Sequence, residues 1–391
     1  MKRLVLLGGG HAHVEVLRDL AERPLRDVEV TVVTPYSRLI YTGMVPGVIA
    51  GHYALADSAI DVAALCREAG ATLLLTSASR VRPGEREVSC GDGSVLPYDV
   101  LSLDVGSVPV TGAAAGAERH AVLMRPMEAL MRGWADVRAR AAAGKVGSIT
   151  VVGAGAAGVE LALAMDYGLR REMKADAPHV RIIADTPVPL PELLAGARAR
   201  LRKRLAKRNI GVHVSSPVKE VGERFVRLQS GIEFASDATF WATGAGAHGW
   251  IRESGFATDE RGFLLTNDFL QSVTYREVFG AGDCASQEHR ALPKAGVFAV
   301  RAAPRLAANL RAALDDAPLE RHVTGARHLQ LVSCGGRYAV GMWNGYSWQG
   351  YWAWLWKDRI DRGFVARYRV AARPAAGPAL ARAGVESRPE L

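Results

Sequence analysis

The sequence predicts an α/β protein built from two Rossmann-like units and a small C-terminal region. Two segments, residues 2–33 and 148–184, share one order of elements: a β-branched strand, a glycine turn, a helical pattern and a second strand. Such strand–helix–strand units form parallel sheets. The end of the chain differs, because five of the eight tryptophans lie between Trp343 and Trp356. A chain of 391 residues has room for two or three domains.

The composition is that of an ordinary soluble globular protein. Hydrophobic residues make up 49% and charged residues 23% of the chain. No stretch reaches the roughly 20 apolar residues of a membrane-spanning helix, and the apolar run after Met1-Lys2-Arg3 is too short for a signal peptide. The net charge of +9 permits a nucleic acid, an anionic membrane or a phosphorylated cofactor as partner and selects none of them.

The four cysteines, at positions 66, 90, 284 and 334, lie far apart. Because no CxxC or other close pair exists, the sequence argues against a zinc ribbon and a local redox dithiol, and scattered cysteines are typical of a reducing compartment. His11 and His13 are two residues apart at a helix start, and no further ligands are evident nearby. No metal site is expected, and His11 is kept as a candidate proton donor.

The first glycine turn, Gly8-x-Gly10, follows the apolar strand 2–7 and opens a helix. In this context the first glycine allows a tight turn, and the second lets the backbone approach a pyrophosphate at the helix N-terminus. His13 fills the third glycine position, so helix and strand should separate slightly there. Thr34 stands where an acidic residue would bind a ribose. The alternative is a glycine turn without a ligand.

The second glycine turn is complete, with Gly153, Gly155 and Gly158 between a strand and a helix. Asp185 falls just after the following strand, where a carboxylate repels a 2′-phosphate and favours NADH over NADPH. Arg181 would argue the other way if it faced the ribose. Two such sites in one chain indicate two nucleotides that exchange electrons, one a flavin and the other a nicotinamide.

The remaining elements follow from hydrophobic periodicity and turn residues. The further strands are predicted at 71–75, 87–89, 100–103, 211–214, 225–228, 233–234 and 278–279. The further helices are a basic amphipathic one at 192–208 and a long one at 296–314. A hairpin around Gly335-Gly336 is predicted at 329–340. From residue 371 onward the chain is rich in Pro, Ala and Gly, which predicts a mobile tail.

Three further segments resemble motifs of a known family. Residues 98–107 and 240–244 resemble the two ATG-type segments of the two-dinucleotide-binding-domain FAD-dependent pyridine nucleotide-disulfide oxidoreductases, and residues 278–285 resemble their second FAD motif. Within that family the chain is similar to type II NADH dehydrogenases and sulfide:quinone oxidoreductases, and looks closest to the flavoprotein fused to selenide, water dikinase. The strings that carry this likeness are GGGHAH at 8–13, YTGMVPGVIAGHY at 41–53, LPKAGVFAVR at 292–301 and WKDRIDRGF at 356–364.

The resemblance implies a glutathione-reductase-type fold in which an NAD(H) domain is inserted into a split FAD domain. FAD is the implied cofactor and NAD(P)H the co-substrate. The implied boundaries are 1–115 for the first part of the FAD-binding domain, 116–262 for the NAD(P)H-binding domain, 263–325 for the second FAD part, 326–370 for a C-terminal hairpin and aromatic amphipathic helix, and 371–391 for the tail.

The resemblance also assigns site residues. Asp185 is added to them because of its position after the second strand, as argued above. Those implied for FAD are Gly8, Gly10, His11, Ala12, Thr34, Arg38, Gly106, Ser107, Asp283, Lys294, Ala295 and Gly296. Those for NAD(H) are Gly153, Gly155, Gly158, Glu160, Asp185 and Gly244. The chemistry would be flavin-mediated, with Lys294, Glu160 and His11 as candidate catalytic side chains.

The implied activity is that of an FAD-dependent NAD(P)H dehydrogenase that passes electrons through the flavin to a quinone or similar acceptor. Two departures bear on it. The chain lacks the redox-active cysteine pair of the disulfide reductases, and residues 292–301 contain no Gln, unlike the quinone-site helix of type II NADH dehydrogenases. Two alternatives stay open: a sulfide or selenide oxidoreductase without nicotinamide use, and a non-catalytic flavin sensor.

The aromatic segment Trp348–Arg369 is the candidate membrane contact. Trp348, Tyr351, Trp352 and Leu355 follow helical spacing, and Lys and Arg follow them, as in an interfacial helix. The alternative is a helix docked on the FAD domain with its charges in water. We expect a cytoplasmic protein; attachment to the inner face of the cell membrane and a homodimer are both left open. No nucleic acid partner is expected, because no RNA- or DNA-binding module is recognisable.

Overall fold

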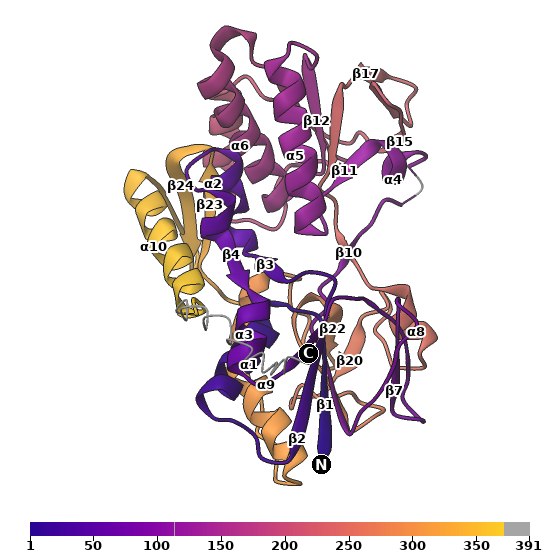
Figure 1. Ribbon diagram of the computed structural model, residues 1–391. Helices are drawn as coiled ribbons and strands as arrows, with labels where there is room; N and C mark the ends of the chain where they lie inside the picture. Colours follow the sequence, from indigo (N-terminus) through magenta and orange to yellow (C-terminus); the bar gives the residue numbers. More distant parts are fainter. Residues whose placement is uncertain (113, 371–391) are drawn as a thin grey trace, which may run out of the picture.

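The computed structural model describes residues 1–112 and 114–370. The two largest sheets of the protein are five-stranded and parallel, and they lie in separate lobes at the bottom and top of Figure 1. Helices cover both sheets, so the α/β class predicted from the sequence is confirmed.

The lower sheet has the strand order β21-β9-β1-β2-β5. Its strands are β1 (Lys2–Leu7), β2 (Val28–Val33), β5 (Thr72–Leu74), β9 (Val100–Leu103) and β21 (Val278–Gly280). Its helices are α1 (His11–Glu22), α3 (Val62–Glu68) and α9 (Gly296–Leu314). The aliphatic side chains of α1, α9, β1 and β2 form one buried core. Strands buried on both faces are continuous apolar runs, which explains why the sequence alone reveals β1 and β2.

The upper sheet has the strand order β11-β18-β12-β13-β14. Its strands are β11 (Ala121–Leu123), β12 (Ser148–Val152), β13 (His179–Ile183), β14 (Gly211–His213) and β18 (Ala238–Trp241), and its helices α5 (Met127–Ala142), α6 (Ala156–Met173) and α7 (Ala195–Lys207). The helix expected at 192–208 begins three residues later. The preceding loop is held in place because the Leu190 N–H donates to the Ala154 carbonyl over 2.8 Å.

The upper sheet is inserted into the lower one. β9 and β21 are paired neighbours, although every strand of the upper sheet lies between them in the sequence. β10 (Val108–Pro109) and β19 (Ala245–Gly246) pair where the chain crosses between the lobes (Figure 1). This order of elements suits a split FAD domain with an inserted NAD(H) domain, while the boundaries at 115, 262 and 325 stay a prediction.

A third sheet and a helix complete the described chain. They are β23 (Gln330–Cys334), β24 (Gly336–Trp343), β25 (Tyr346–Gly350) and α10 (Tyr351–Arg367). The hairpin predicted at 329–340 is therefore part of a three-stranded meander. Trp348 lies on β25 and not on the helix that its spacing predicted, because the chain turns at Gly350 (φ +138°) before α10 begins. The tail predicted at 371–391 lies outside the described residues.

The remaining elements are short. The strands are β3 (Arg38–Ile40), β4 (Ala59–Asp61), β6 (Ala78–Arg82), β7 (Glu87–Cys90), β8 (Val95–Pro97), β15 (Val218–Val221), β16 (Phe225–Leu228), β17 (Glu233–Ala235), β20 (Leu264–Thr266) and β22 (Ala285–Gln287). The helices are α2 (Val45–Ile49), α4 (Ala117–His120) and α8 (Gly249–Glu253), with 3-10 turns at Thr42–Met44, Leu55–Ser58, Lys174–Asp176 and Gly282–Cys284.

Candidate functional site

The first glycine turn joins β1 to the N-terminus of α1, as predicted. Gly8 has φ +94°, and a Cβ there would lie 2.3 Å from the Asp104 carbonyl oxygen. A Cβ on Gly10 would lie 2.4 Å from the Asp104 carboxylate. Only glycine fits either position, since the end of β9 runs directly beneath the turn. The two glycines therefore let the turn pack directly against the end of β9.

Asp104 is a site residue that the sequence analysis missed. Its Oδ2 accepts hydrogen bonds from the backbone N–H groups of Ala12 (2.7 Å) and His13 (3.1 Å), at the start of α1. Burial raises the pKa of the Asp104 carboxyl to about 7, against the two N–H groups, which lower it. A neighbouring carboxylate, Asp283, raises it further. An acidic residue in the first ATG-type segment was the one available sequence signal.

His13 shows how a large residue replaces the third glycine. Its Nδ1–H donates to the Gly8 carbonyl over 2.6 Å, so Nε2 accepts from the Ser102 hydroxyl over 2.9 Å. Burial lowers the pKa of His13 to about 4, which keeps the ring neutral. The imidazole thus ties α1 to β1 and β9 through hydrogen bonds instead of the close glycine packing.

His11 lies where α1 and α9 begin. Its Nε2 is buried without a hydrogen-bond partner among the described residues, and a Cβ on Gly296 would lie 4.0 Å from it. The ring packs beside Tyr41 and Phe364, and burial lowers the pKa of His11 to about 4. An unpaired buried nitrogen between two helix N-termini fits a polar ligand placed there.

Arg125 is a second missed residue. Its Nη2 lies 2.8 Å from Oδ2 of Asp283, and its Nη1 donates to the Ser107 hydroxyl. Arg125 follows β11 of the upper sheet, whereas Asp283 follows β21 of the lower one. The contact therefore links the lobes and places a cation beside two residues implied for FAD. No local pattern marks Arg125, because its partners are distant in the sequence.

The other residues implied for FAD lie around this point. Thr34 is buried directly after β2, and Gly106 follows Asp104 with φ +71°. Ala295 caps α9, while Arg38 is exposed on β3. Lys294 lines a cavity together with Asp283. Its Nζ donates to the Ala285 carbonyl (2.5 Å) and the Ser286 hydroxyl (2.9 Å), above the Phe263 ring.

The second glycine turn joins β12 to α6. Gly153 has φ +115°, and a Cβ there would lie 2.4 Å from the Ala242 carbonyl oxygen. A Cβ on Gly158 would lie 2.1 Å from the Gly153 carbonyl, so the third glycine lets α6 pack closely on the turn. A Cβ on Gly244 would meet nothing within 4 Å, so the groove beside it is open.

The residues after β13 include Asp185, whose contact with a ribose stays a prediction. Asp185 is exposed two residues beyond the strand end. Arg181 does not compete with it, because its guanidinium lies over the Phe234 ring, 5.2 Å from the centroid. Another acidic residue, Glu192, reaches the glycine turn itself, and its Oε1 accepts from the Ala156 N–H over 2.9 Å.

Glu160 faces the C-terminal sheet. Its carboxylate accepts from the Ser333 N–H over 2.6 Å. Burial raises the pKa of Glu160, and the nearby charge of Lys357 offsets part of that rise. Burial would lower the pKa of Lys357, but Asp361 and Glu160 outweigh it and raise that pKa. Two carboxyls therefore share one buried ammonium.

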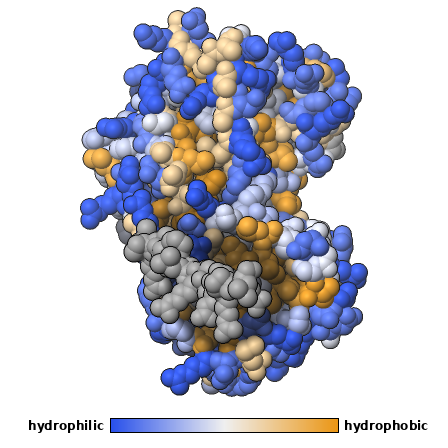
Figure 2. Space-filling view, in the orientation of Figure 1, coloured by the Kyte–Doolittle hydropathy of each residue, from blue (hydrophilic) through white to orange (hydrophobic). Residues whose placement is uncertain are grey.

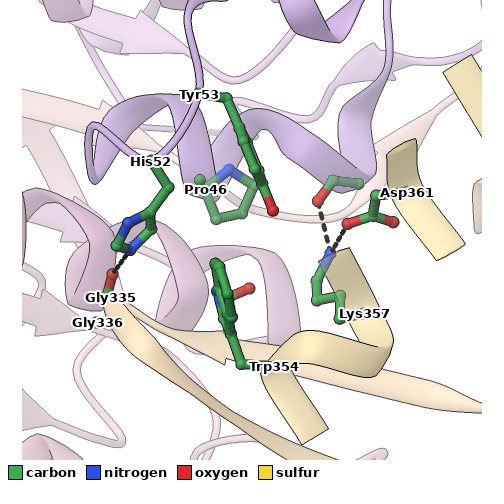
Figure 3. Close-up of a pocket in the computed structure, with 11 residues that line it drawn as sticks. Pro46, His52, Tyr53, Gly335, Gly336, Trp354, Lys357 and Asp361 are labelled. Carbon is green, nitrogen blue, oxygen red and sulfur yellow. Dashed lines mark hydrogen bonds and ion pairs between the residues drawn. The ribbon is translucent and has the colours of Figure 1, made fainter. Parts of the chain in front are cut away.

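A small pocket opens beside this cluster (Figure 3). Lys357 Nζ donates to the Gly43 carbonyl and to Asp361 Oδ2, each over 2.6 Å, at one side of the pocket. Its other labelled walls are Pro46, His52, Tyr53, Gly335, Gly336 and Trp354. The pocket thus combines flat aromatic walls with a buried cation around a free volume of about 10 Å³, room for about one water molecule.

Comparison with known proteins decides the family. The profile described as "Pyridine nucleotide-disulphide oxidoreductase" matches residues 2–307. The chain belongs to this family. The recognition from sequence is confirmed, and with it the oxidoreductase class. The two glycine turns at helix N-termini and the unpaired His11 nitrogen fit the expected cofactors, FAD and NAD(P)H.

Several curated proteins are similar to the chain. A "Probable NADH dehydrogenase" of Dictyostelium discoideum is 22% identical over 338 residues, which cover 78% of this chain and 72% of that protein. An "Internal alternative NAD(P)H-ubiquinone oxidoreductase A1, mitochondrial" of Arabidopsis thaliana is 24% identical over 314 residues, 72% of this chain and 61% of that one. "Ferroptosis suppressor protein 1" of Taeniopygia guttata is 28% identical over 282 residues, 68% and 70% of the two chains.

Solved structures share the fold. NDH2 from Plasmodium falciparum, solved in complex with NADH, superposes with a TM-score of 0.79 at 14% identity, covering 93% of this chain and 97% of that one. The sulfide:quinone oxidoreductase of Aquifex aeolicus gives a TM-score of 0.78 at 18% identity, covering 94% and 92%. At these identities the two structures establish the fold alone.

Proposed function

We propose that the protein is an FAD-dependent NAD(P)H dehydrogenase that passes electrons to a quinone or similar small acceptor. The observation that carries the proposal is the pair of glycine turns, one at the end of β1 and one at the end of β12, each opening onto a helix N-terminus. Two such turns serve two nucleotides. The curated relatives with NADH dehydrogenase and NAD(P)H-ubiquinone oxidoreductase names support the same assignment.

The lower lobe is the proposed FAD site. The first glycine turn and the Arg125 guanidinium would bind the pyrophosphate, and Asp283 would bind the ribityl hydroxyls. The N-terminus of α9, at Ala295 and Gly296, would face the flavin ring and stabilise negative charge on it. FAD supplies the redox chemistry, accepting a hydride from a nicotinamide and giving two electrons to the acceptor.

The upper lobe is the proposed NAD(P)H site. The turn at Gly153 and Gly155 would receive the pyrophosphate, and Asp185 would accept hydrogen bonds from the adenosine ribose. Because a carboxylate repels a 2′-phosphate, and Arg181 is held over Phe234, the proposed co-substrate preference is NADH.

The acceptor is proposed to be a small molecule and not a disulfide. All four cysteines are free and buried, and burial raises the pKa of Cys284 to about 12, so its thiolate is scarce. The acceptor would enter beside Tyr53 and Trp354, where the walls of the small pocket would have to move apart to admit it. Reducing a quinone to a quinol consumes two protons, and Glu160 and Lys357 would help to supply them from the buried cluster.

An anaerobic stopped-flow experiment tests the proposal. The purified yellow protein is mixed with NADH, with NADPH and, separately, with sulfide or selenide. We expect NADH to bleach the flavin band near ~450 nm rapidly and a soluble quinone to restore it. Bleaching by sulfide or selenide alone would replace this proposal with the chalcogenide alternative. A flavin that no donor reduces would support a non-catalytic sensor.

We further propose that α10 contacts a membrane surface. One side of α10 is docked, because Phe364 and Val365 are buried in the core of the lower lobe. The other side exposes Trp352 (53%) and Trp356 (40%), and Figure 2 shows pale and orange residues among the blue on that flank. Among the described helices, none is long and apolar enough to cross a bilayer. An exposed aromatic face beside Lys and Arg suits peripheral attachment; a second copy of the chain is the competing occupant.

A further inference from the structure

The first backbone N–H of α6 is already bound to a carboxylate of the protein itself, that of Glu192. The Oε1 atom of Glu192 accepts from the Ala156 N–H over 2.9 Å, and Ala156 is the first residue of this helix. The first N–H groups of a helix have no partner within it and attract anions. Glu192 therefore occupies the position that the glycine turn offers to a pyrophosphate.

The loop before α7 places Glu192 there. After Asp185 the chain returns to the turn, where the Leu190 N–H donates to the Ala154 carbonyl over 2.8 Å. A Cβ on Gly155 would lie 3.7 Å from Glu192 Oε1, so the carboxylate rests against the second glycine itself. Within residues 1–112 and 114–370, Glu192 makes no ion pair that would hold it elsewhere.

The first glycine turn offers a comparison within the same chain. There Asp104 accepts from the Ala12 N–H, but it is buried at the end of β9 and supports the turn from beneath. Glu192 is exposed at the end of a loop, so its side chain can rotate into water at small cost. The carboxylate at the first turn is a fixed part of the cradle, whereas the one at the second turn is displaceable.

We propose that Glu192 competes with the dinucleotide pyrophosphate for the N-terminus of α6 and thereby sets the affinity for the nicotinamide nucleotide. This inference rests on the proposed NAD(P)H site. A bound dinucleotide must displace the Glu192 carboxylate, which then loses its hydrogen bond to the Ala156 N–H. The displaced carboxylate still repels the nearby pyrophosphate to some extent. The penalty falls on binding and is the same in ground and transition states, so Glu192 raises KM without changing the rate of flavin reduction at saturation.

Equilibrium binding of NAD⁺ and NADP⁺ to the oxidised holoenzyme tests the proposal without turnover. Isothermal titration calorimetry would compare the wild type with Glu192→Gln and Glu192→Ala. Glu253→Gln is the matched control, because Glu253 is an exposed glutamate on α8. We expect both Glu192 variants to lower Kd about tenfold for NAD⁺ and for NADP⁺ alike, and the control to match the wild type.

Stopped-flow reduction by NADH supplies the second readout. We expect KM to fall in step with Kd in the Glu192 variants, while the limiting rate of flavin reduction is unchanged. An unchanged or raised Kd in both variants, with NAD⁺ still bound by the wild type, overturns the role of Glu192 and leaves the proposed function standing. If neither the wild type nor the variants bind NAD⁺, the proposed NAD(P)H site and this inference fall together.

Discussion

The Nζ atom of Lys357 lies 2.6 Å from Oδ2 of Asp361, and the two residues are 8% and 4% exposed. They sit one turn apart on α10, with the Gly43 carbonyl as a further acceptor for Lys357. A buried ion pair of this kind need not stabilise the fold, because desolvating two charges offsets much of their attraction. Removing one partner, however, leaves the other charge buried and alone.

The first prediction concerns this pair. Lys357→Met should lower the free energy of unfolding by about 3–5 kcal/mol, because Asp361 is left unpaired. The double variant Lys357→Met, Asp361→Asn should recover part of that loss, since only Glu160 then remains as a buried carboxyl without its cation. Urea unfolding measures both, with Lys203→Met, at an exposed position on α7, as control. A double variant as unstable as the single one would contradict this account.

The same variant separates the two half-reactions of the proposed function. Hydride transfer from NADH to the flavin needs no proton from Lys357, so flavin reduction should proceed near the wild-type rate. Reoxidation by a quinone should slow at least tenfold, because the acceptor pocket loses its buried cation and a proton source. Equal effects on both steps would show that Lys357 does not act on the acceptor side.

The second prediction follows from the raised pKa of Asp104. The folded protein holds this proton up to about pH 7, whereas an unfolded chain loses it near its ordinary value of about 3.8. The contribution is therefore fully present below about pH 4 and is lost as the pH rises to 7. Asp104→Asn imitates the protonated carboxyl. Relative to the wild type, its stability should rise between pH 4 and pH 8 by up to roughly 4 kcal/mol.

Urea unfolding at a series of pH values checks this. The groups that face Asp104 are the carboxylate of Asp283, the thiol of Cys284 and the two N–H groups of α1. His13 titrates oppositely, since its lowered pKa removes stability as the pH falls from 6.5 towards 4, and it does so in both proteins. A stability difference that does not change with pH would mean that Asp104 is ionised throughout.

The third prediction concerns the choice of co-substrate. Asp185→Ser should lower the ratio of kcat/KM for NADH to that for NADPH by about tenfold, because the repulsion of the 2′-phosphate is lost. Arg181→Ala should leave the ratio unchanged, since that guanidinium lies over Phe234. Steady-state kinetics with both nucleotides measures the two variants. A change of ratio in the Arg181 variant alone would reverse the assignment.

The fourth prediction tests the exposed face of α10. Trp352→Ser, Trp356→Ser should reduce co-sedimentation with vesicles containing anionic lipid by at least about tenfold, because two amphipathic rings are lost. Leu75→Ser is the control, as Leu75 is exposed (62%) on the lower lobe. Sedimentation velocity distinguishes the competing occupant: a dimer that the double variant dissolves, without any vesicle binding by the wild type, would assign the face to a second copy.

Local patterns predicted much of the fold. Gly8 and Gly153 were recognisable because a strand, a turn needing positive φ and a helix follow each other within a few residues. The helix Gly296–Leu314 was predicted with its observed ends. The sequence analysis placed Trp348 on the helix because it precedes Tyr351 and Trp352 by three and four positions, which is a helical spacing. The spacing does not reveal that the strand ends at Gly350, between these residues.

Contacts between distant segments could not be predicted. Arg125 meets Asp283 across the two lobes, and no short window of sequence contains both. Glu160 was selected for its position after the second glycine turn, yet its partners, Ser333 and Lys357, come from the C-terminal region. The chemistry of a site depends on contacts between residues that are distant in the sequence. The location of a site can be predicted because glycines mark the local turns that it needs.

The insertion of the upper sheet has a consequence for synthesis on the ribosome. All strands of the upper sheet leave the ribosome before β21, which pairs with β9 and completes the lower sheet. The inserted lobe can therefore fold first, while the edge of β9 stays unpaired until β21 is synthesised. Until that strand arrives, the nascent chain exposes an unpaired apolar edge, and it is during this interval that chaperones would bind it.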